Sequence, residues 1–234
     1  MNIVKILGLP VTTLTEPQVH FWLKQQLQNN SGVKIVFTPN PEILVLAKQN
    51  LAFFNILNQA DLCLPDGQGI VWFSKQQIKQ RITGVDTMLY LLQLAHEQEL
   101  TVGLVFNTKG LSTQADLEAV FAKQYQNCRL VIMSNVDVVP NVILDIILVG
   151  LGAPQQENWA IKHKLELNKT KLVLTVGGGL DFLTKKQQRA PLFFRKIGLE
   201  WLWRLWWQPI KRLKRISNAV IVFSIYCLRE RIKQ

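Results

Sequence analysis

The sequence has few residues that could cross-link the chain or bind a metal. Cys63, Cys128 and Cys227 show no CxxC or paired spacing in 234 residues. We therefore expect free structural thiols in a reducing compartment. No Asp-x-Asp pair occurs, so the usual carboxylate clamp for a metal–nucleotide complex is missing. GxGxxG and GxxxxGK[ST] are also absent, which argues against a dinucleotide fingerprint and a P-loop.

Long hydrophobic runs are absent as well. The last apolar-rich run, residues 216–228, has about a dozen residues, whereas a membrane-spanning helix needs roughly 20. The first residues, MNIVKILGLPV, are too short and too weakly charged for a signal peptide, and no small-residue cleavage site follows. We therefore expect neither a transmembrane segment nor a secretory leader.

Acidic residues are scarce at one end of the chain only. Residues 1–181 hold 14 Lys or Arg and 14 Asp or Glu, whereas residues 182–234 hold 13 basic residues against Glu200 and Glu230. The whole net charge of +11 therefore lies in the last quarter. Such a concentration indicates a polyanionic partner, either nucleic acid or an anionic membrane. No helix-turn-helix, zinc or RNP-type signature is present, so we expect no nucleic-acid binding.

The body of the chain alternates between short apolar runs and helical patterns. A strand that enters a loop is predicted within 33–41, a short strand and loop within 60–67, and further strands at 101–106, 145–152 and 171–179. Helices are predicted at 41–50, 85–100, 112–125 and 154–165. Asp86 is the expected cap of the 85–100 helix. Apolar strands separated by helices predict an α/β fold, with a mostly parallel, Rossmann-like sheet covered by helices on both faces. We expect the α/β body to span residues 1–188.

Residues 189–234 differ in composition from the body and are predicted to form a basic, Trp-rich helical appendage. Four of the seven tryptophans lie within 201–207, and Pro209 should kink a helix there. On a helical wheel of 199–215, the apolar side carries Leu199, Leu202, Trp203, Trp206, Ile210 and Leu213, and the opposite side carries Glu200, Arg204, Gln208, Lys211 and Arg215. This pattern favours an interfacial helix on anionic lipid, the alternative being a helix docked on the core.

Polar and glycine-rich stretches follow four of the predicted strands. They are TPNPE (38–42), PDGQG (65–69), GLGAPQQE (150–157) and GGGLDF (177–182). Parallel strands end at one edge of a sheet, where ligands bind, and glycines let backbone N–H groups approach a phosphate. Any one stretch could be a structural turn, but together they favour a ligand that carries a diphosphate.

These stretches also carry a family resemblance. TPNPE, LPDGQGIVW, RITGVD, LVGLGAPQQENW, VGGGLDFL and RAPLFFRKIGLEWLWRL, in this order, resemble the motifs of the WecG/TagA/CpsF family of bacterial glycosyltransferases. The likeness runs from about Gly8 to Arg215. It implies inverting, metal-independent transfer of an N-acetylhexosamine-type sugar without a cofactor; N-acetylmannosamine or its uronic acid is favoured. The donor would be a UDP-sugar and the acceptor N-acetylglucosamine on a polyprenyl diphosphate. The enzyme would be peripheral on the cytoplasmic face of the bacterial inner membrane, with a homo-oligomer left open.

The resemblance implies a catalytic role for Asp66 of the PDG sequence. Inversion needs one base to take the proton of the acceptor hydroxyl during direct displacement. The family pattern assigns this role to Asp66. The alternative from the residues alone is an N-cap for a helix that starts near Gly67.

Other family positions imply contacts with substrate. Thr38 and Asn40 would lie near donor or acceptor. Arg81 would contact phosphate unless it is a surface arginine, and Gln156 would hydrogen-bond substrate unless it only starts a helix. Three cations of the appendage would help to hold the diphosphate: Arg204, Lys211 and Lys214.

Two other functions remain open from the sequence. A doubly wound, nucleotide-dependent oxidoreductase would share the fold, but the missing GxGxxG argues against it. A non-catalytic membrane scaffold derived from the enzyme would also fit. Phe106-Asn107-Thr108 replaces the glycine pair that the family often has at that point, and the segment from Met133 to Asn141 is short.

Overall fold

The computed structural model describes residues 3–29, 32–133, 137–196, 198–200, 202–203 and 217–232. Six parallel strands form its central sheet: β3 (Lys34–Phe37), β4 (Leu62–Cys63), β5 (Thr101–Phe106), β6 (Arg129–Met133), β7 (Ile146–Gly150) and β8 (Leu172–Thr175). Their order across the sheet is β4-β3-β8-β7-β5-β6. The first two strands of the sheet, β3 and β4, therefore lie at one side and the next two, β5 and β6, at the other. The last two, β7 and β8, lie between them.

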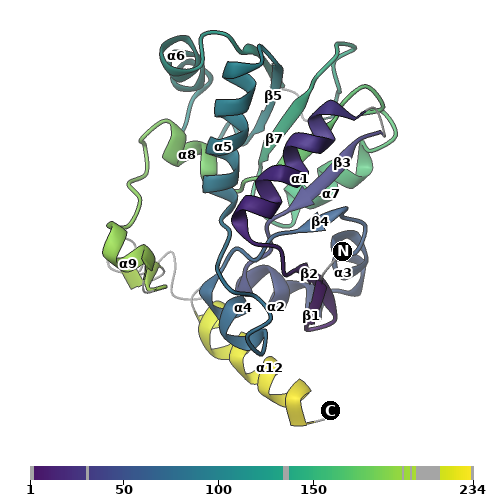
Figure 1. Ribbon diagram of the computed structural model, residues 1–234, viewed down its shortest axis with the longest axis vertical. Helices are drawn as coiled ribbons and strands as arrows, with labels where there is room; N and C mark the ends of the chain where they lie inside the picture. Colours follow the sequence, from purple (N-terminus) through teal and green to yellow (C-terminus); the bar gives the residue numbers. More distant parts are fainter. Residues whose placement is uncertain are drawn as a thin grey trace.

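Each face of the sheet is buried in its own hydrophobic cluster. Successive strand residues point to opposite faces; in β3, Ile35 and Phe37 join one cluster and Val36 the other. The Val36 face is covered by α1 (Glu16–Gln28), α5 (Gly84–Glu97), α6 (Gln114–Gln124) and α8 (Gly179–Leu183). The Phe37 face is covered by α2 (Pro41–Gln49), α3 (Leu51–Leu57), α4 (Gln68–Phe73) and α7 (Gln155–Lys162) (Figure 1). The predicted α/β class, with helices on both faces, is confirmed.

An N-terminal hairpin packs on the face of the sheet to which Phe37 points. Strands β1 (Ile3–Ile6) and β2 (Leu9–Thr12) pair antiparallel through a turn at Leu7 and Gly8, whose φ angles are 50° and 87°. Leu9 and Val11 are fully buried in the cluster that also contains Phe37. The sequence analysis did not predict this hairpin, α1, α3 or β6.

The predicted elements are present, but one helix start was wrong. The N-cap of α5 is Thr83 rather than Asp86, because the Thr83 hydroxyl accepts the Asp86 N–H at 3.0 Å. Asp86 lies in the first turn instead. The short strand and loop predicted for 60–67 are confirmed, with β4 ending at Cys63. Beyond it, residues 64–67 form the loop that carries Asp66.

We call residues 189–234 the C-terminal segment, and its described part packs against the body. It contains α9 (Leu192–Lys196), the π-helix η1 (Asn218–Val222) and α12 (Phe223–Ile232). Phe223 is fully buried and meets Phe73 of α4 edge-on, with ring centroids 5.6 Å apart. α12 contacts α2 and α4, as Figure 1 shows at the end of the molecule opposite α6. No helix among the described residues is long and apolar enough to cross a membrane.

Candidate active site

The loops after β3 and β4 meet at the carboxyl edge of the sheet. The Asp66 N–H donates to the Pro39 carbonyl at 3.1 Å, which ties PDGQG to TPNPE. Thr38 extends the connection to β8, because its hydroxyl donates to the Thr175 carbonyl at 2.9 Å. This edge is where open α/β sheets bind ligands. The structure thus brings together the two loops that the sequence singled out first.

Asp66 lies at the N-terminus of α5. Its Oδ2 accepts a hydrogen bond from the Gly84 N–H at 3.1 Å, and the side chain is partly buried. The N-cap of α4 is Gly67, with no side-chain cap. Asp66 therefore does not cap the helix that follows it in sequence. It faces the positive end of a helix 18 residues further along the chain, which favours a negative charge on its carboxylate.

A cavity of about 230 Å³ opens beside this carboxylate. Below, we call it the Asp66 cavity. Its polar wall is formed by Asn40, Glu42, Asp66, Arg81 and Glu200. Its apolar wall is formed by Trp72, Phe73, Val220 and Phe223. The cavity thus combines a group that can move a proton, a cation and an apolar surface, and its walls come from both the body and the C-terminal segment.

Close packing explains the glycines around the cavity. A Cβ on Gly67 would lie 2.4 Å from Pro41 Cδ, and one on Gly69 would lie 3.3 Å from Phe223 Cε1. Gly198, at φ +77°, lies so close to Gln68 that a Cβ would approach its Cγ to 2.4 Å. These glycines let α2, η1 and α12, and the segment 198–200, pack directly on the PDGQG loop.

Thr38 and Asn40 have clear structural partners. Thr38 is buried beneath Gly84, whose added Cβ would lie 3.0 Å from the threonine hydroxyl. Asn40 caps α2, because its Oδ1 accepts the Ile43 N–H at 3.0 Å. Only Asn40 of the two lines the cavity. Direct contact of either residue with substrate stays a prediction.

Arg81 is neither isolated nor on the surface. Its Nη2 pairs with Glu200 Oε2 at 3.1 Å, and the two side chains are 15% and 8% exposed. The pair lines the cavity and joins the segment before α5 to the C-terminal segment. Arg81 thus lines the cavity, and its charge is balanced there by a partner that the sequence did not indicate. Its contact with phosphate stays a prediction.

Gln156 lies away from the cavity lining and is fully buried at the start of α7. Its Oε1 accepts the Gly177 N–H at 2.9 Å, and its Nε2 donates to Glu157 Oε1 at 2.8 Å. Glu157 is also buried, and burial raises its pKa to about 7 despite the hydrogen bond from Gln156. In this structure Gln156 therefore holds the glycine turn after β8 in place.

The sequence analysis missed a second ion pair beside the cavity. Arg189 donates to both carboxylate oxygens of Asp86, with Nη1–Oδ1 at 2.7 Å and Nη2–Oδ2 at 3.1 Å. Arg189 belongs to the RAPLFF stretch, which carries part of the family resemblance, and Asp86 was predicted only as a helix cap. No local pattern marks this pair, because Arg189 and Asp86 are 103 residues apart in the chain. Arg204, Lys211 and Lys214 lie outside the described residues.

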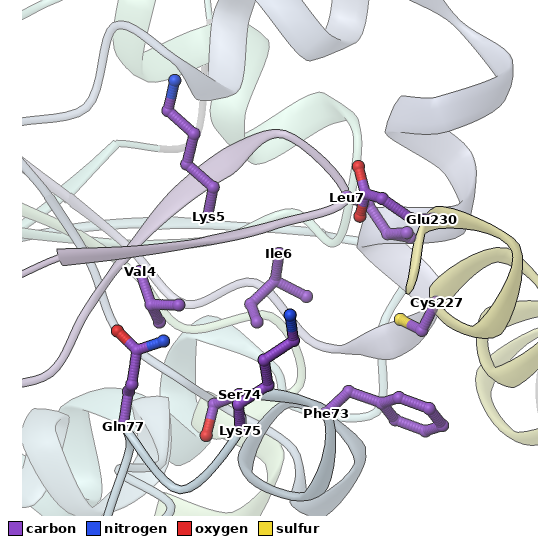
Figure 2. Close-up of a pocket in the computed structure, with 10 residues that line it drawn as sticks. All are labelled: Val4, Lys5, Ile6, Leu7, Phe73, Ser74, Lys75, Gln77, Cys227 and Glu230. Atoms are coloured by element: carbon purple, nitrogen blue, oxygen red, sulfur yellow. The ribbon is translucent and has the colours of Figure 1, made fainter. Parts of the chain in front are cut away.

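A second cavity, of about 190 Å³, contains none of the predicted site residues. Figure 2 shows its lining, which comes from β1 and its turn, the end of α4 and α12. Lys5, Lys75 and Glu230 are its charged members. Among the described residues, no group of three or more His, Cys, Asp or Glu could hold a metal ion. Because Asn40, Asp66 and Arg81 of the predicted site line it, the Asp66 cavity is the candidate active site.

Comparison with known proteins defines the class. The chain matches the model of the Glycosyl transferase WecG/TagA/CpsF family over residues 4–234 and belongs to that family. It is a glycosyltransferase of this family. The chain is 30% identical, over 246 aligned residues, to an N-acetylglucosaminyldiphosphoundecaprenol N-acetyl-beta-D-mannosaminyltransferase of Staphylococcus aureus strain MRSA252. The alignment covers 99% of this chain and 95% of that protein. The protein of the same name in strain NCTC 8325 is equally similar.

Proposed function

We propose that this chain transfers an N-acetylhexosamine, with N-acetylmannosamine or its uronic acid favoured, from UDP to N-acetylglucosamine on a polyprenyl diphosphate. The observation that carries the proposal is the position of Asp66: a carboxylate at the wall of a cavity, at the start of α5 and at the carboxyl edge of the sheet. The names of the relatives supply the acceptor, because they specify an undecaprenol-linked N-acetylglucosaminyl diphosphate.

The reaction is a single displacement that inverts the anomeric carbon. Asp66 takes the proton of the acceptor hydroxyl while that oxygen forms a bond to the anomeric carbon of the donor sugar. The bond from this carbon to the UDP oxygen breaks at the same time, and UDP leaves with the electron pair. Arg81 lines the same cavity and is our candidate for a phosphate contact, with Arg204, Lys211 and Lys214 as further cations. The proposal needs no metal and no cofactor.

The acceptor is lipid-linked, so we also propose that the C-terminal segment, residues 189–234, binds the membrane peripherally on its cytoplasmic face. Along η1 and α12, Ile221, Ile225, Leu228 and Ile232 are all exposed, from 42% to 85%. They are spaced along one helical face, opposite the buried Phe223. An exposed apolar stripe in the basic quarter of the chain suits an anionic lipid surface.

The experiment uses the purified full-length chain with a panel of UDP-sugars and a synthetic prenyl-diphosphate N-acetylglucosamine. We expect release of UDP only when donor and acceptor are both present, with UDP-N-acetylmannosamine or its uronic acid as the best donor and an inverted linkage in the product. Full activity after chelation of metals is expected. Binding to anionic vesicles without any transfer would favour the scaffold, and binding of NADH in preference to UDP would favour the oxidoreductase.

A further inference from the structure

Two ion pairs connect the start of the C-terminal segment to one short stretch of the body. Arg189 pairs with Asp86 through two hydrogen bonds, and Glu200 pairs with Arg81. Both body partners lie within residues 81–86, a stretch that ends in the first turn of α5. We call residues 81–86 the α5 lead-in. The polar contacts from both ends of residues 189–200 thus converge on the α5 lead-in.

The α5 lead-in also holds the loop of Asp66. The Ile82 N–H donates to the Pro65 carbonyl at 3.1 Å, and the Gly84 N–H donates to Asp66 Oδ2 at 3.1 Å. From below, Thr38 packs against Gly84 closely enough that a Cβ there would lie 3.0 Å from its hydroxyl. A small rotation of the first turn of α5 would therefore move the N–H group that fixes Asp66.

The Arg189–Asp86 pair is charged and partly buried, with the Arg189 side chain 20% exposed and the Asp86 side chain 40%. Burial opposes the charge on Asp86, but the hydrogen bonds from Arg189 and Thr83 and the nearby charges of Arg189 and Arg195 lower its pKa overall. Burial likewise opposes the charge on Arg189, while Asp86, Glu200 and Asp66 raise its pKa overall. Removing one partner leaves the other charge uncompensated in a partly buried place and also removes the two hydrogen bonds that hold Asp86 to Arg189. The pair can therefore control the orientation of this turn.

We propose that Arg189 and Asp86 are positioning residues, which make the placement of Asp66 depend on the docking of the C-terminal segment. The inference rests on the proposed function, in which Asp66 is the base. Neither residue lines the Asp66 cavity; they act through the Gly84 N–H. Correct geometry at Asp66 then requires the segment after Arg189 to be folded against the body.

The structure supplies a matched control at α6. Asp116 occupies the same first-turn position there behind the cap Thr113, and Lys186 pairs with it at 3.0 Å. Lys186 and Arg189 are three residues apart in the chain. The lining of the Asp66 cavity includes no residue of α6. Lys186→Gln and Asp116→Asn therefore remove an equivalent pair that does not lead to Asp66.

The experiment measures kcat, KM for the UDP-sugar and amide hydrogen exchange in the full-length chain. Asp86→Asn and Arg189→Gln should each lower kcat by about 10- to 100-fold, as misplacement of a catalytic group does, with KM changed by less than about threefold. The double variant should be no slower than the worse single variant, because both break the same link. Exchange of peptides within 64–86 should rise in these variants and stay at the wild-type level in Lys186→Gln and Asp116→Asn.

Two further variants separate charge from geometry. Arg189→Lys keeps a cation but loses the paired contact, so it should lower kcat while leaving the acidic limb of the kcat/KM–pH profile in place. Arg189→Gln removes a cation near Asp66, so it should also move that limb to higher pH. Among the described residues, the other charged groups that line the cavity with Asp66 are Glu42, Arg81 and Glu200, and these stay constant in this comparison.

Three results would overturn the inference. One is that Arg189→Gln and Lys186→Gln have the same kcat and the same exchange in 64–86, which would make both pairs merely structural. Another is a loss of kcat in Arg189→Gln without any change in exchange, which would mean that Arg189 acts on the substrate directly. If the wild-type chain transfers no sugar, the proposed function fails, and the exchange measurement alone decides whether Arg189 controls 64–86; unchanged exchange would then refute the link.

Discussion

The first turns of helices α5 and α6 have nearly the same residue pattern but different neighbours. Each has a threonine N-cap, Thr83 or Thr113, and an aspartate three residues later, Asp86 or Asp116. Each aspartate pairs with a cation from residues 186–189. In α6 the Lys186 side chain is 45% exposed and the Asp116 side chain 26%, and hydrogen bonds from Thr113, with help from Lys186, lower the pKa of Asp116 to about 2. In α5 the Arg189 side chain is 20% exposed and the Asp86 side chain 40%, and the neighbouring Gly84 N–H donates to Asp66 Oδ2.

A third helix extends the comparison. Glu157 stands at the equivalent first-turn position of α7, behind the cap residue Pro154. It is buried, its Oε2 has no hydrogen-bond partner among the described residues, and its pKa rises to about 7 through burial. An acidic residue at the same first-turn position therefore has three different environments. Asp116 is part of a cap in α6, Asp86 pairs with Arg189 in α5, and Glu157 is buried in α7. Only the surroundings in three dimensions decide between these outcomes.

The largest expected difference lies between Asp66 and Asp116. Asp66→Asn should lower kcat by about 1,000-fold, because it removes the proposed base while its amide oxygen can still accept the Gly84 N–H. Asp116→Asn should leave kcat unchanged. Steady-state transfer assays on both variants, with thermal melting to confirm folding, measure the contrast. A loss of less than about tenfold for Asp66→Asn, below the roughly 100- to 10,000-fold that a general base contributes, would dismiss Asp66 from that role.

Next in size is a pH-dependent gain in stability on replacing Glu157. Its folded pKa of about 7 exceeds the reference value of 4.5, so the native state holds the proton longer than the unfolded state. The wild-type chain therefore loses stability relative to Glu157→Gln as pH rises from about 4.5 to 7, by up to ~3 kcal/mol, and the difference is constant above that range.

Urea unfolding at pH 5 and pH 8 measures this effect. Asp116→Asn is the control. Its lowered pKa gives stability that is present above the unfolded pKa and is lost only as pH falls toward 2. Its difference from wild type should therefore be the same at pH 5 and pH 8. An equally constant difference for Glu157→Gln would show that Glu157 is ionised at both pH values.

Changing the first residue of each helix should have a smaller effect. Gly84→Ala places a Cβ 3.0 Å from Thr38 Oγ1 and 3.1 Å from its Cγ2. We expect a loss of about 1–2 kcal/mol from overpacking and about a tenfold loss of kcat through the shifted N–H. Gln114→Ala in α6 should change neither. Thr38→Ser removes Cγ2, so it should restore part of the activity of Gly84→Ala; no recovery would exclude this contact as the cause.

The smallest effect is expected from the caps themselves. Thr83→Ala and Thr113→Ala should each cost about 1 kcal/mol of stability, the usual value for an N-cap. Only Thr83→Ala should also lower kcat, by about threefold, since its hydroxyl bonds Asp86 at 2.6 Å beside the turn that holds Asp66. Equal kcat values in the two variants would mean that loss of the Thr83 hydroxyl does not disturb the placement of Asp66.

Much of this fold could be predicted from particular runs of residues. VKIVF, TVGLVF and KLVLT are apolar without alternation, which is typical of strands buried on both faces, and they form β3, β5 and β8. The hairpin β1–β2 was missed because IVKILGLPVT contains a left-handed turn at Leu7 and Gly8 rather than a pair of turn residues such as Asn-Gly. β6 was missed because its apolar run is short and only its last residue is buried.

The candidate site was predictable only in part. Asp66 and Asn40 were predicted because polar residues at strand ends gather at one edge of a parallel sheet, and Arg81 was predicted from the family resemblance. All three line one cavity, while their roles stay predictions. Glu200 and Arg189 were not found, since each meets a partner more than 100 residues away in sequence. Gln156 follows a strand end too, yet its amide is directed to Gly177 and Glu157 rather than to the cavity.

By itself, the sequence determined the fold class, the family, the free cysteines and the position of the excess positive charge, because each depends on residue type and order along the chain. The tertiary structure alone decided that Asp66 meets the start of α5 and not of α4, that Arg81 meets Glu200, and that three first-turn acids have three different environments. The physical reason is that charge and hydrogen bonding depend on burial and on partners distant in sequence, which no local pattern encodes.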